Sequence, residues 1–498
     1  MIDRPGGKRV LSPRGRLERE LSSWTMPVVA ALVSVGTAVV LIVMWHWVDG
    51  VHFGDDAKKA AAHLEVVKVA SAIAVGGGGL FALYLSARRQ RTTERELRHV
   101  ELDAAERRVT ELYTKAADQL GSDKAPVRLA GLYALERLAD GAPQHRRTVI
   151  DLLCAYLRMP FEQPAQRPPA AGDDRLVVSE EHRKWTQERE VRLTAQRILA
   201  NRLRRGGCDS GEATGKPNTP EHWLGPINLD LTSAVLIDFD LTGCTLHTAV
   251  FARATFLGNT SFSGTAFTGE TRFDAAVFGG LTRFDRAAFC GRTVFSAATF
   301  EDHVVFHDST FDGGAVFARA VFASAVGFEN VAFAAAAAFD YAKFTGDARF
   351  AKAVFAGSAR FNNTTWANGA VFDAASFEGS ARFDAARFGG AAWFGSVRFG
   401  GDAWFIASTF ASAEFTGATF ERGARFDRSR FDGHTEFDRA TFGNPATMQD
   451  VQLSPSSQRE SQLPRRRWPT GWTVEQPLRS VEPDHRKQRL VPVPVVLD

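Results

Sequence analysis

The sequence predicts a mainly β protein: a four-sided coil of short strands, preceded by a transmembrane α-hairpin and a small helical domain. Three observations lead to this prediction. Large apolar residues, almost all Phe, recur every five or six residues for about two hundred residues. The same region lacks proline between Pro226 and Pro445, although the chain has 20 prolines. Two long apolar runs and several amphipathic segments precede it.

The overall composition is that of a folded protein with several domains. Of its residues, 45% are hydrophobic and 23% are charged. A chain of 498 residues is too long to fold around a single hydrophobic core, so we expect several domains. Its four cysteines show no CxxC or other metal-ligand spacing: Cys154, Cys208, Cys244 and Cys290. We therefore expect unpaired thiols in a reducing compartment.

Two apolar runs near the N-terminus predict membrane spans. Residues 1–25 are basic, and residues 26–48, "MPVVAALVSVGTAVVLIVMWHWV", are long and apolar enough to cross a bilayer. A second run covers 66–87, after a loop over 49–65. A signal peptide followed by a buried core helix is the alternative, but the first run is long and lacks a convincing cleavage site.

Basic residues flank the two runs, and they set the expected orientation. Arginines and lysines are frequent before the first run, and Arg88, Arg89 and Arg91 follow the second, whereas the connecting loop is mixed. By the positive-inside rule both termini are then cytoplasmic, and the protein lies in the cell membrane. Everything after residue 88 faces the cytosol, in agreement with the cysteine usage.

Small residues recur at every fourth position in both runs and indicate close helix packing. Almost no polar or charged group lies within the runs, so we expect an anchor hairpin and not a channel or transporter. The residues of the two small stripes are Ala30, Ser34 and Ala38, and Ala70, Ala74, Gly78 and Ala82.

A helical cytoplasmic domain is expected over 88–210. Residues 91–120 alternate charged and apolar groups at helical spacing and stop at Gly121. The pattern "VRLAGLYALERL" (127–138) partly recurs as "VRLTAQRILANRL" (191–203). Two such units resemble HEAT-type helical pairs, and an ordinary small helical bundle explains them equally well.

The spacing of the phenylalanines excludes both a helix and a flat strand. In "ARFDAARFGGAAWFGSVRFGG" (381–401) the steps between Phe are five, six and five. Five residues place successive Phe about 140° apart around a helix, and an odd offset places them on opposite faces of a strand. The chain therefore turns a corner between one Phe and the next, with Phe inward and Arg382, Arg387 and Arg398 outward.

The rhythm persists long enough to predict the coil. Between 251 and 442 there are 36 such positions, 35 of them Phe and one Trp366, and only the two steps of five to Phe415 and Phe420 break the alternation. Four walls per coil use 20 to 22 residues, and coils stacked about 4.8 Å apart give about ten coils. Proline is absent because a continuous ladder needs backbone N–H donors.

These residues resemble a known family. "LTSAVLIDFDLTGCTL" and "ATFLGNTSFSGTAF" look like a pentapeptide-repeat protein, which implies a right-handed quadrilateral β-helix over 226–445. Upstream, "YTKAADQLGSDKAPVRLAGLYALERLA" and "VIDLLCAYLRMPF" resemble the membrane-anchored pentapeptide-repeat proteins of actinobacteria. The six-residue step departs from the family pattern, and we expect it to widen alternate corners slightly.

The expected function is a non-catalytic, membrane-anchored scaffold with an unidentified cytosolic protein partner. Some members of the resembling family mimic DNA and bind type II topoisomerases such as gyrase, which is the alternative. Mimicry needs dense acidic charge, whereas residues 226–445 hold 18 Lys/Arg and 23 Asp/Glu, a net −5. We expect no nucleic-acid partner. The resemblance also allows a homodimer through terminal coils.

No catalytic, cofactor or metal site is predicted, and no partner-binding residue is assigned. His303, His307 and Asp308 are close in sequence, as are His434 and Glu436, but outward residues of neighbouring walls diverge. No Ser/His/Asp set, Walker loop or Cys/His cluster is present.

The final segment, 446–498, is rich in Pro, Arg and Gln and is predicted to be disordered. A solvated tail is one interpretation. Contact with an anionic membrane or a partner is the other, through Arg465, Arg466, Arg467, Trp468 and Trp472.

Overall fold

The computed structural model of the chain divides into two compact units, Met1–Arg108 and Val109–Asp498. We describe each unit by itself. The structure describes residues 25–51, 56–161, 175–204, 223, 226–453, 466–469, 471–474 and 488–492.

The first unit contains α1 (Thr25–Gly50) and most of α2 (Asp56–Leu120). The two helices meet beside the turn, where Asp49 pairs with Lys59 at 3.2 Å and the ring of His63 packs on that of Trp45 at 4.1 Å. The expected loop over 49–65 is much shorter, since α2 already begins at Asp56. No proline interrupts α2, so it also continues past residue 87 without a break.

One helix in the described part of the chain is long and apolar enough to cross a membrane, Ala57–Tyr84, with a mean hydropathy of 1.8. The apolar part of α1, Ser34–Gly50, is shorter. Both helices expose large apolar side chains; Val75 is 76% exposed and Leu32 is 66% exposed. Length and composition thus support one candidate span. A buried core helix or a signal sequence would meet the same criterion.

The small-residue stripes do not form the helix contact that the sequence predicted. Among them Ala70 is buried, whereas the described side chains of the others are exposed: Ser34, Ala38, Ala74, Gly78 and Ala82. Larger residues, Val48 and Val66, are buried instead. The helices are held by side-chain contacts near the turn and not by a groove of small residues.

The second unit begins with a helical bundle. It comprises the end of α2, α3 (Ala125–Gly141), the short η1 (Pro143–His145), α4 (Arg146–Arg158) and α5 (Arg175–Leu203). The two similar sequence segments lie in α3 and α5, and their matching arginines, Arg128 and Arg192, both contact Glu188 at 3.0 Å. The described helices form one bundle and not two consecutive helical pairs.

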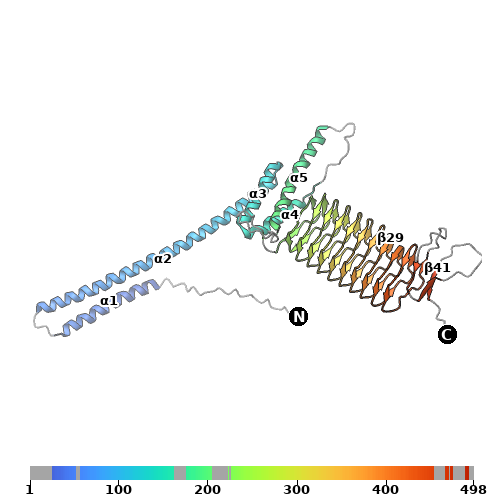
Figure 1. Ribbon diagram of the computed structural model, residues 1–498. Helices are drawn as coiled ribbons and strands as arrows, with labels where there is room; N and C mark the ends of the chain where they lie inside the picture. Colours follow the sequence, from blue (N-terminus) through green and yellow to red (C-terminus); the bar gives the residue numbers. More distant parts are fainter. Residues whose placement is uncertain are drawn as a thin grey trace, which may run out of the picture. The chain divides into compact units, whose positions relative to one another are not determined.

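After the bundle the chain winds into a parallel β-solenoid of four walls (Figure 1). Wall 1 is a sheet of ten strands, β1 (Asn228–Asp230), β4 (Thr248–Val250), β8 (Thr271–Arg272), β12 (Thr293–Val294), β16 (Ala315–Val316), β20 (Ala337–Ala338), β24 (Ala359–Arg360), β28 (Ala381–Arg382), β31 (Ala403–Trp404) and β34 (Ala424–Arg425). Wall 4 is a second sheet of ten, β3 (Thr245–Leu246), β7 (Ala266–Phe267), β11 (Ala288–Phe289), β15 (Thr310–Phe311), β19 (Ala332–Phe333), β23 (Val354–Phe355), β27 (Ser376–Phe377), β30 (Arg398–Phe399), β33 (Thr419–Phe420) and β37 (Thr441–Phe442).

Walls 2 and 3 are joined because two strands run around the corner between them, β29 (Arg387–Trp393) and β32 (Thr409–Glu414). Wall 2 also contains β2 (Val235–Ile237), β5 (Thr255–Leu257), β9 (Val277–Phe278), β13 (Thr299–Phe300), β17 (Val321–Phe322), β21 (Lys343–Phe344), β25 (Thr365–Trp366), β35 (Arg430–Phe431) and β38 (Gln452–Leu453). Wall 3 contains β6 (Thr260–Ser261), β10 (Thr282–Arg283), β14 (Val304–Val305), β18 (Val326–Gly327), β22 (Ala348–Arg349), β26 (Ala370–Val371), β36 (Thr435–Glu436) and β39 (Arg466–Arg467).

The five-residue and six-residue steps correspond to two kinds of corner. In a five-residue step such as Phe273 to Phe278, Ala275 has a φ of 53° and Ala276 N–H donates to Phe273 O at 3.1 Å, which closes a tight turn. The six-residue steps lie at the alternate corners, where coils approach closely. A Cβ on Gly291 would lie 2.4 Å from Gly269 O. The alternating steps therefore correspond to two turn types, and the six-residue corner contains one residue more.

The break in the rhythm lies at the corner shared by β29 and β32. Pairing shifts between Phe388 and Ala391, which face Phe410 and Ser412. Because β32 is one residue shorter than β29, this corner is made in five residues instead of six. The chain absorbs the missing residue locally and restores a 22-residue offset by Thr435, which pairs with Ala413.

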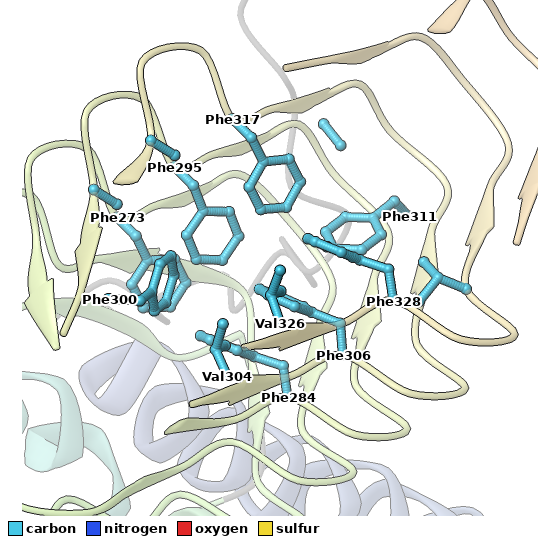
Figure 2. Packing of buried hydrophobic residues seen from close by; sticks show 14 of the residues in the cluster. Phe273, Phe284, Phe295, Phe300, Val304, Phe306, Phe311, Phe317, Val326 and Phe328 are labelled. Atoms are coloured by element: carbon cyan, nitrogen blue, oxygen red, sulfur yellow. The ribbon is translucent and has the colours of Figure 1, made fainter. Parts of the chain in front are cut away.

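The phenylalanines form four columns inside the coil. Rings 21 or 22 residues apart stack with centroids 4.5 to 5.1 Å apart, as in Phe256–Phe278 and Phe300–Phe322. Figure 2 shows Phe273, Phe295 and Phe317 in one such column. Neighbouring columns meet edge to face, an arrangement that aromatic rings favour over a face-to-face sandwich. The prediction of inward Phe is confirmed.

The single tryptophan in these columns has its polar atom satisfied. Trp366 Nε1 donates to Thr364 Oγ1 at 2.9 Å, and Thr364 Oγ1 donates to Phe361 O at 2.7 Å. Thr364 is buried two residues before Trp366, where the adjacent coils carry Ala342 and Ala386. A buried indole N–H without a partner would be costly, so this threonine allows tryptophan in a column of phenylalanine.

The bundle covers the first coil. Gln196 on α5 pairs with both backbone groups of Ile237, its Nε2 donating to Ile237 O at 2.7 Å and its Oε1 accepting from Ile237 N–H at 3.0 Å. Arg158 on α4 donates to Asp230 O at 2.9 Å. Helical side chains thus satisfy backbone groups that another coil would otherwise bind.

The C-terminal segment covers the last coil, which corrects the prediction of disorder for its described parts. Strands β38 and β39 extend walls 2 and 3, and β41 (Gln488–Pro492) pairs antiparallel with β38 and with β40 (Trp472–Val474). The Trp468 ring lies 5.5 Å from that of Phe431. The polar composition of this segment suggested disorder. The open strand edges of the last coil, however, provide hydrogen-bonding partners for its backbone.

Replacing one ring in the middle of a column should weaken the whole solenoid. Phe328 is fully buried and stacks on Phe306 and Phe350 at 4.7 Å. We expect Phe328→Ala to lower the free energy of unfolding by about 3–5 kcal/mol, measured by urea denaturation. Tyr341→Ala, at a 55% exposed corner, should change it by about 0.5 kcal/mol or less. Similar losses in both variants would contradict the stacked-core account.

Candidate functional site

Charged residues of both signs cover the outer walls. Some pairs join adjacent coils, as Arg360–Asp340 at 3.0 Å and Arg398–Glu421 at 2.7 Å do. Others flank an inward Phe on one strand, as Arg272–Asp274 at 2.9 Å does. The walls therefore alternate in charge and do not present a continuous acidic face.

Several aspartates are also bound to the backbone of the next coil. Asp347 accepts from Gly369 N–H at 3.1 Å, and Asp373 accepts from Gly395 N–H at 2.9 Å. These carboxylates lie along the wall and support the ladder. Part of the formal negative charge of the solenoid is thus structural.

Burial has a further effect on one of these aspartates. Asp384 accepts a hydrogen bond from Ile406 N–H at 3.2 Å. Burial raises the pKa of its carboxyl above the ordinary value, and the backbone hydrogen bond and nearby arginines oppose that rise. This carboxylate is therefore partly withdrawn from solvent.

Three aromatic residues lie on the outside, which the sequence analysis did not single out. The ring of Trp393 covers Gly369 on wall 3, where a Cβ would lie 2.9 Å from it. Trp404 on wall 1 lies under the guanidinium of Arg382 at 3.9 Å. Tyr341 occupies a corner. The "WF" dipeptides at 393–394 and 404–405 were a usable signal, since outward positions rarely carry large aromatic groups.

The sequence-adjacent histidines do not gather. His303 pairs with Asp302 at 2.7 Å, His307 contacts Glu329 of the next coil, and His434 pairs with Glu436 at 3.3 Å. The described residues contain no group of three or more His, Cys, Asp or Glu placed to hold a metal ion. Each histidine instead has its own acidic neighbour on the wall.

Two buried cysteines lie at or near the junction of bundle and solenoid. Cys154 on α4 and Cys244 in the first coil are buried, and burial raises the pKa of each thiol to about 12. Cys244 lies 3.6 Å from Ala200 O on α5. Cys290 is exposed on wall 4, and Cys208 lies outside the described residues. The described cysteines are free thiols, as expected.

A cavity of about 230 Å³ also lies at this junction. Its lining comes from the start of α4 and the first coil and includes Arg146, Arg147, Trp223 and Ile227. Arg146 donates to Ala139 O at 3.1 Å, and Trp223 donates to Asp140 at 3.1 Å. Among the described residues that line it, there is no carboxylate, histidine or thiol that could act as a general base or nucleophile.

The tail residues expected to touch a membrane or partner are engaged within the fold. Arg466 donates to the carbonyl oxygens of Asp432 and Gly433, both at 3.4 Å, and Arg467 pairs with Glu436 at 3.5 Å. Trp468 packs on the last Phe rings, and Trp472 lies in β40. Arg465 lies outside the described residues.

Comparison with known proteins supports the repeat assignment over part of the solenoid. A family model of pentapeptide repeats, containing nine copies, matches residues 361–409 and 394–441. No curated protein and no solved structure matches the chain. The matched residues cover the last coils, including both outward tryptophans and the corner where the rhythm breaks.

Thiol labelling can test the junction. In a Cys208→Ser variant at pH 8, we expect a maleimide to modify Cys290 rapidly and Cys154 and Cys244 only after unfolding, because both are buried and protonated. Gln196→Ala removes two hydrogen bonds to Ile237 and should raise Cys244 labelling by roughly tenfold or more through local opening. Gln144→Ala, at an exposed position, serves as the control. An unchanged rate of Cys244 labelling in Gln196→Ala would argue that the hydrogen bonds between Gln196 and Ile237 do not hold the bundle on the first coil.

Proposed function

We propose that the chain is a non-catalytic, membrane-anchored interaction module that presents the side walls of its pentapeptide-repeat solenoid to a cytosolic protein partner. One observation carries the proposal: both ends of the solenoid are covered, by α4 and α5 at the start and by β38–β41 at the end. Open strand edges are the usual sites of end-to-end association. With these covered, the side walls are the surface left for a partner.

The solenoid suits extended lateral contact. Its coils repeat at a fixed rise, and stacked rings and corner turns hold each outward residue in place. A rigid surface loses little conformational entropy on binding, so modest contacts along several coils can add up to useful affinity. Pentapeptide-repeat proteins are generally non-catalytic, and this chain resembles them over residues 361–441.

The charge distribution favours a protein partner over DNA mimicry. A mimic of a duplex needs an unbroken acidic surface. On these walls the carboxylates of Asp340, Glu421 and Asp427 each pair with an arginine, and residues such as Asp347 bind the backbone. Binding to gyrase as a DNA mimic is therefore the less supported function.

Membrane anchoring completes the proposal. The apolar surface of Ala57–Tyr84 and of α1 has few protein contacts, and such exposed apolar surface is suited to lipid. Basic residues before α1 and after position 87 favour a hairpin with both termini in the cytoplasm. The solenoid would then be held at the inner surface of the cell membrane.

Site-specific photo-crosslinking of the full chain in cells tests the lateral-contact proposal. A photoreactive amino acid would replace one exposed residue at a time, Arg360 on wall 1, Arg387 on wall 2, Arg349 on wall 3 or Val354 on wall 4. As the control, it would replace Trp468 at the covered end of the solenoid. We expect a discrete protein adduct from at least one wall and none from Trp468. Adducts confined to Trp468, or none from any wall, would refute it. Recovery of gyrase would instead favour mimicry.

Charge insertion tests the anchor. A Leu32→Arg and Val75→Arg double variant places one arginine on each apolar helix. Inserting an arginine at the centre of a bilayer costs about 2.5–3.5 kcal/mol of free energy per residue. We expect the protein to move from the membrane pellet to the supernatant on carbonate extraction. A Leu112→Arg and Tyr133→Arg variant, at exposed apolar positions outside both runs, should stay in the pellet. Equal pelleting of both variants would contradict membrane insertion.

A further inference from the structure

The outward residues of wall 1 change character along the solenoid. After β1, each strand of this wall contributes one outward side chain directly before an inward Phe. The early coils contribute mostly small or apolar groups, Val250, Arg272, Val294, Val316 and Ala338, and the late coils contribute Arg360, Arg382, Trp404 and Arg425. We call these last four residues the Arg–Trp strip. They occupy consecutive strands, β24, β28, β31 and β34.

One arginine of the strip is held in place and keeps its donors free. The guanidinium of Arg382 stacks on the Trp404 ring at 3.9 Å, and that of Arg425 lies 5.9 Å from the same ring. Stacking restricts the orientation of the group without using its N–H donors. Within the described chain the Arg382 guanidinium makes no ion pair or hydrogen bond. It therefore presents five donors to a carboxylate.

The strip presents positive charge although aspartates lie beside its arginines. In the pair Arg360–Asp340 the arginine side chain is 53% exposed and the carboxylate 20%; in Arg425–Asp427 the values are 48% and 10%. Asp427 also accepts from Gln449 N–H at 3.0 Å. The carboxylates are tied to the wall while the guanidinium groups extend beyond them. An approaching partner meets the arginines first.

The centre of the strip is apolar. Ile406 lies beside Trp404 at a position just after the inward Phe, and both are partly exposed. Other coils carry small or polar residues at the position of Ile406: Asp274, Ser296, Ala318, Asp340, Asn362, Asp384 and Asp427. Tryptophan and arginine are the residue types most enriched at energetically important contacts. This departure from the repeat therefore distinguishes one place on the wall.

From these features we infer that the Arg–Trp strip binds an extended acidic segment of the partner protein. Its residues follow one another at about 4.8 Å per coil, so Arg360 and Arg425 lie about 14 Å apart. In an extended chain, residues i and i+4 lie about 13 Å apart, with i+2 between them on the same side. An acidic residue at position i would face Arg360 and Arg382, and an apolar residue at i+2 would face Trp404. A second acidic residue at i+4 would face Arg425. This inference rests on the proposed function and specifies its wall and partner chemistry.

Fluorescence anisotropy with the full chain in detergent tests the inference. The probe is a fluorescein-labelled peptide with a Glu-Ser-Leu-Ser-Glu core, and its counterpart carries Lys in place of Glu. We expect the acidic peptide to bind, more weakly at higher salt, and the Lys peptide not to bind. Arg382→Glu should weaken binding by at least about tenfold. Trp404→Ala, which keeps every charge, should do the same.

A matched control separates the strip from general electrostatics. Arg349→Glu makes the same charge change on wall 3, at an exposed residue, and should alter binding by less than about twofold. Equal binding of the acidic and Lys peptides, or no effect of Arg382→Glu, would overturn the inference. If wall crosslinks persist in that case, the proposed function still stands. Loss of self-association or of anionic-vesicle binding in Arg382→Glu, without peptide binding, would assign the strip to a second copy or to lipid and also overturn it.

Discussion

The parallel stacking of one coil on the next is the constraint on which the rest of this structure depends. Inward Phe rings 21 or 22 residues apart stack at 4.5 to 5.1 Å, a spacing close to that of paired strands, and Trp366 joins its column at 3.9 Å from Phe344 and 5.6 Å from Phe388. The same registry fixes the left-handed corner residues, the close approach at Gly291, and the absence of proline. Because the backbone donors of the walls are used mostly by neighbouring coils, the two ends require special partners, and the chain supplies them from α5 and from its C-terminal segment.

The sequence predicted what is repeated and missed what occurs once. The inward Phe and the alternation of five-residue and six-residue steps recur many times, so one chain repeats the same pattern often enough to reveal it. The clamp of Gln196 on Ile237 and the packing of Trp468 on Phe431 are single long-range contacts without a local pattern. The early start of α2 and the exposure of the small stripes escaped prediction for the same reason, since both depend on how two helices meet.

The outward residues that could bind a partner were not predicted from the sequence, because their arrangement does not repeat. Periodicity assigns a residue to the inside or the outside, but it treats all outward residues alike. Formal charge is also uninformative here, because a net −5 over the solenoid does not show which charges reach solvent. The structure shows that the carboxylates of Asp427 and Asp384 are tied into the wall whereas Arg382 is not. Outward chemistry is therefore a property of the folded surface more than of composition.

The corner at β29 and β32 has an evolutionary consequence. A one-residue deletion elsewhere in a strand would turn every following side chain inside out, yet here the loss is confined to a wide corner and the columns continue through Phe410 and Phe431. The six-residue corners are thus the places where such a gene can gain or lose a codon without changing which side chains point inward in the coils that follow. Duplication of a whole 22-residue unit would lengthen it equally safely, so its length and its surface chemistry can evolve independently.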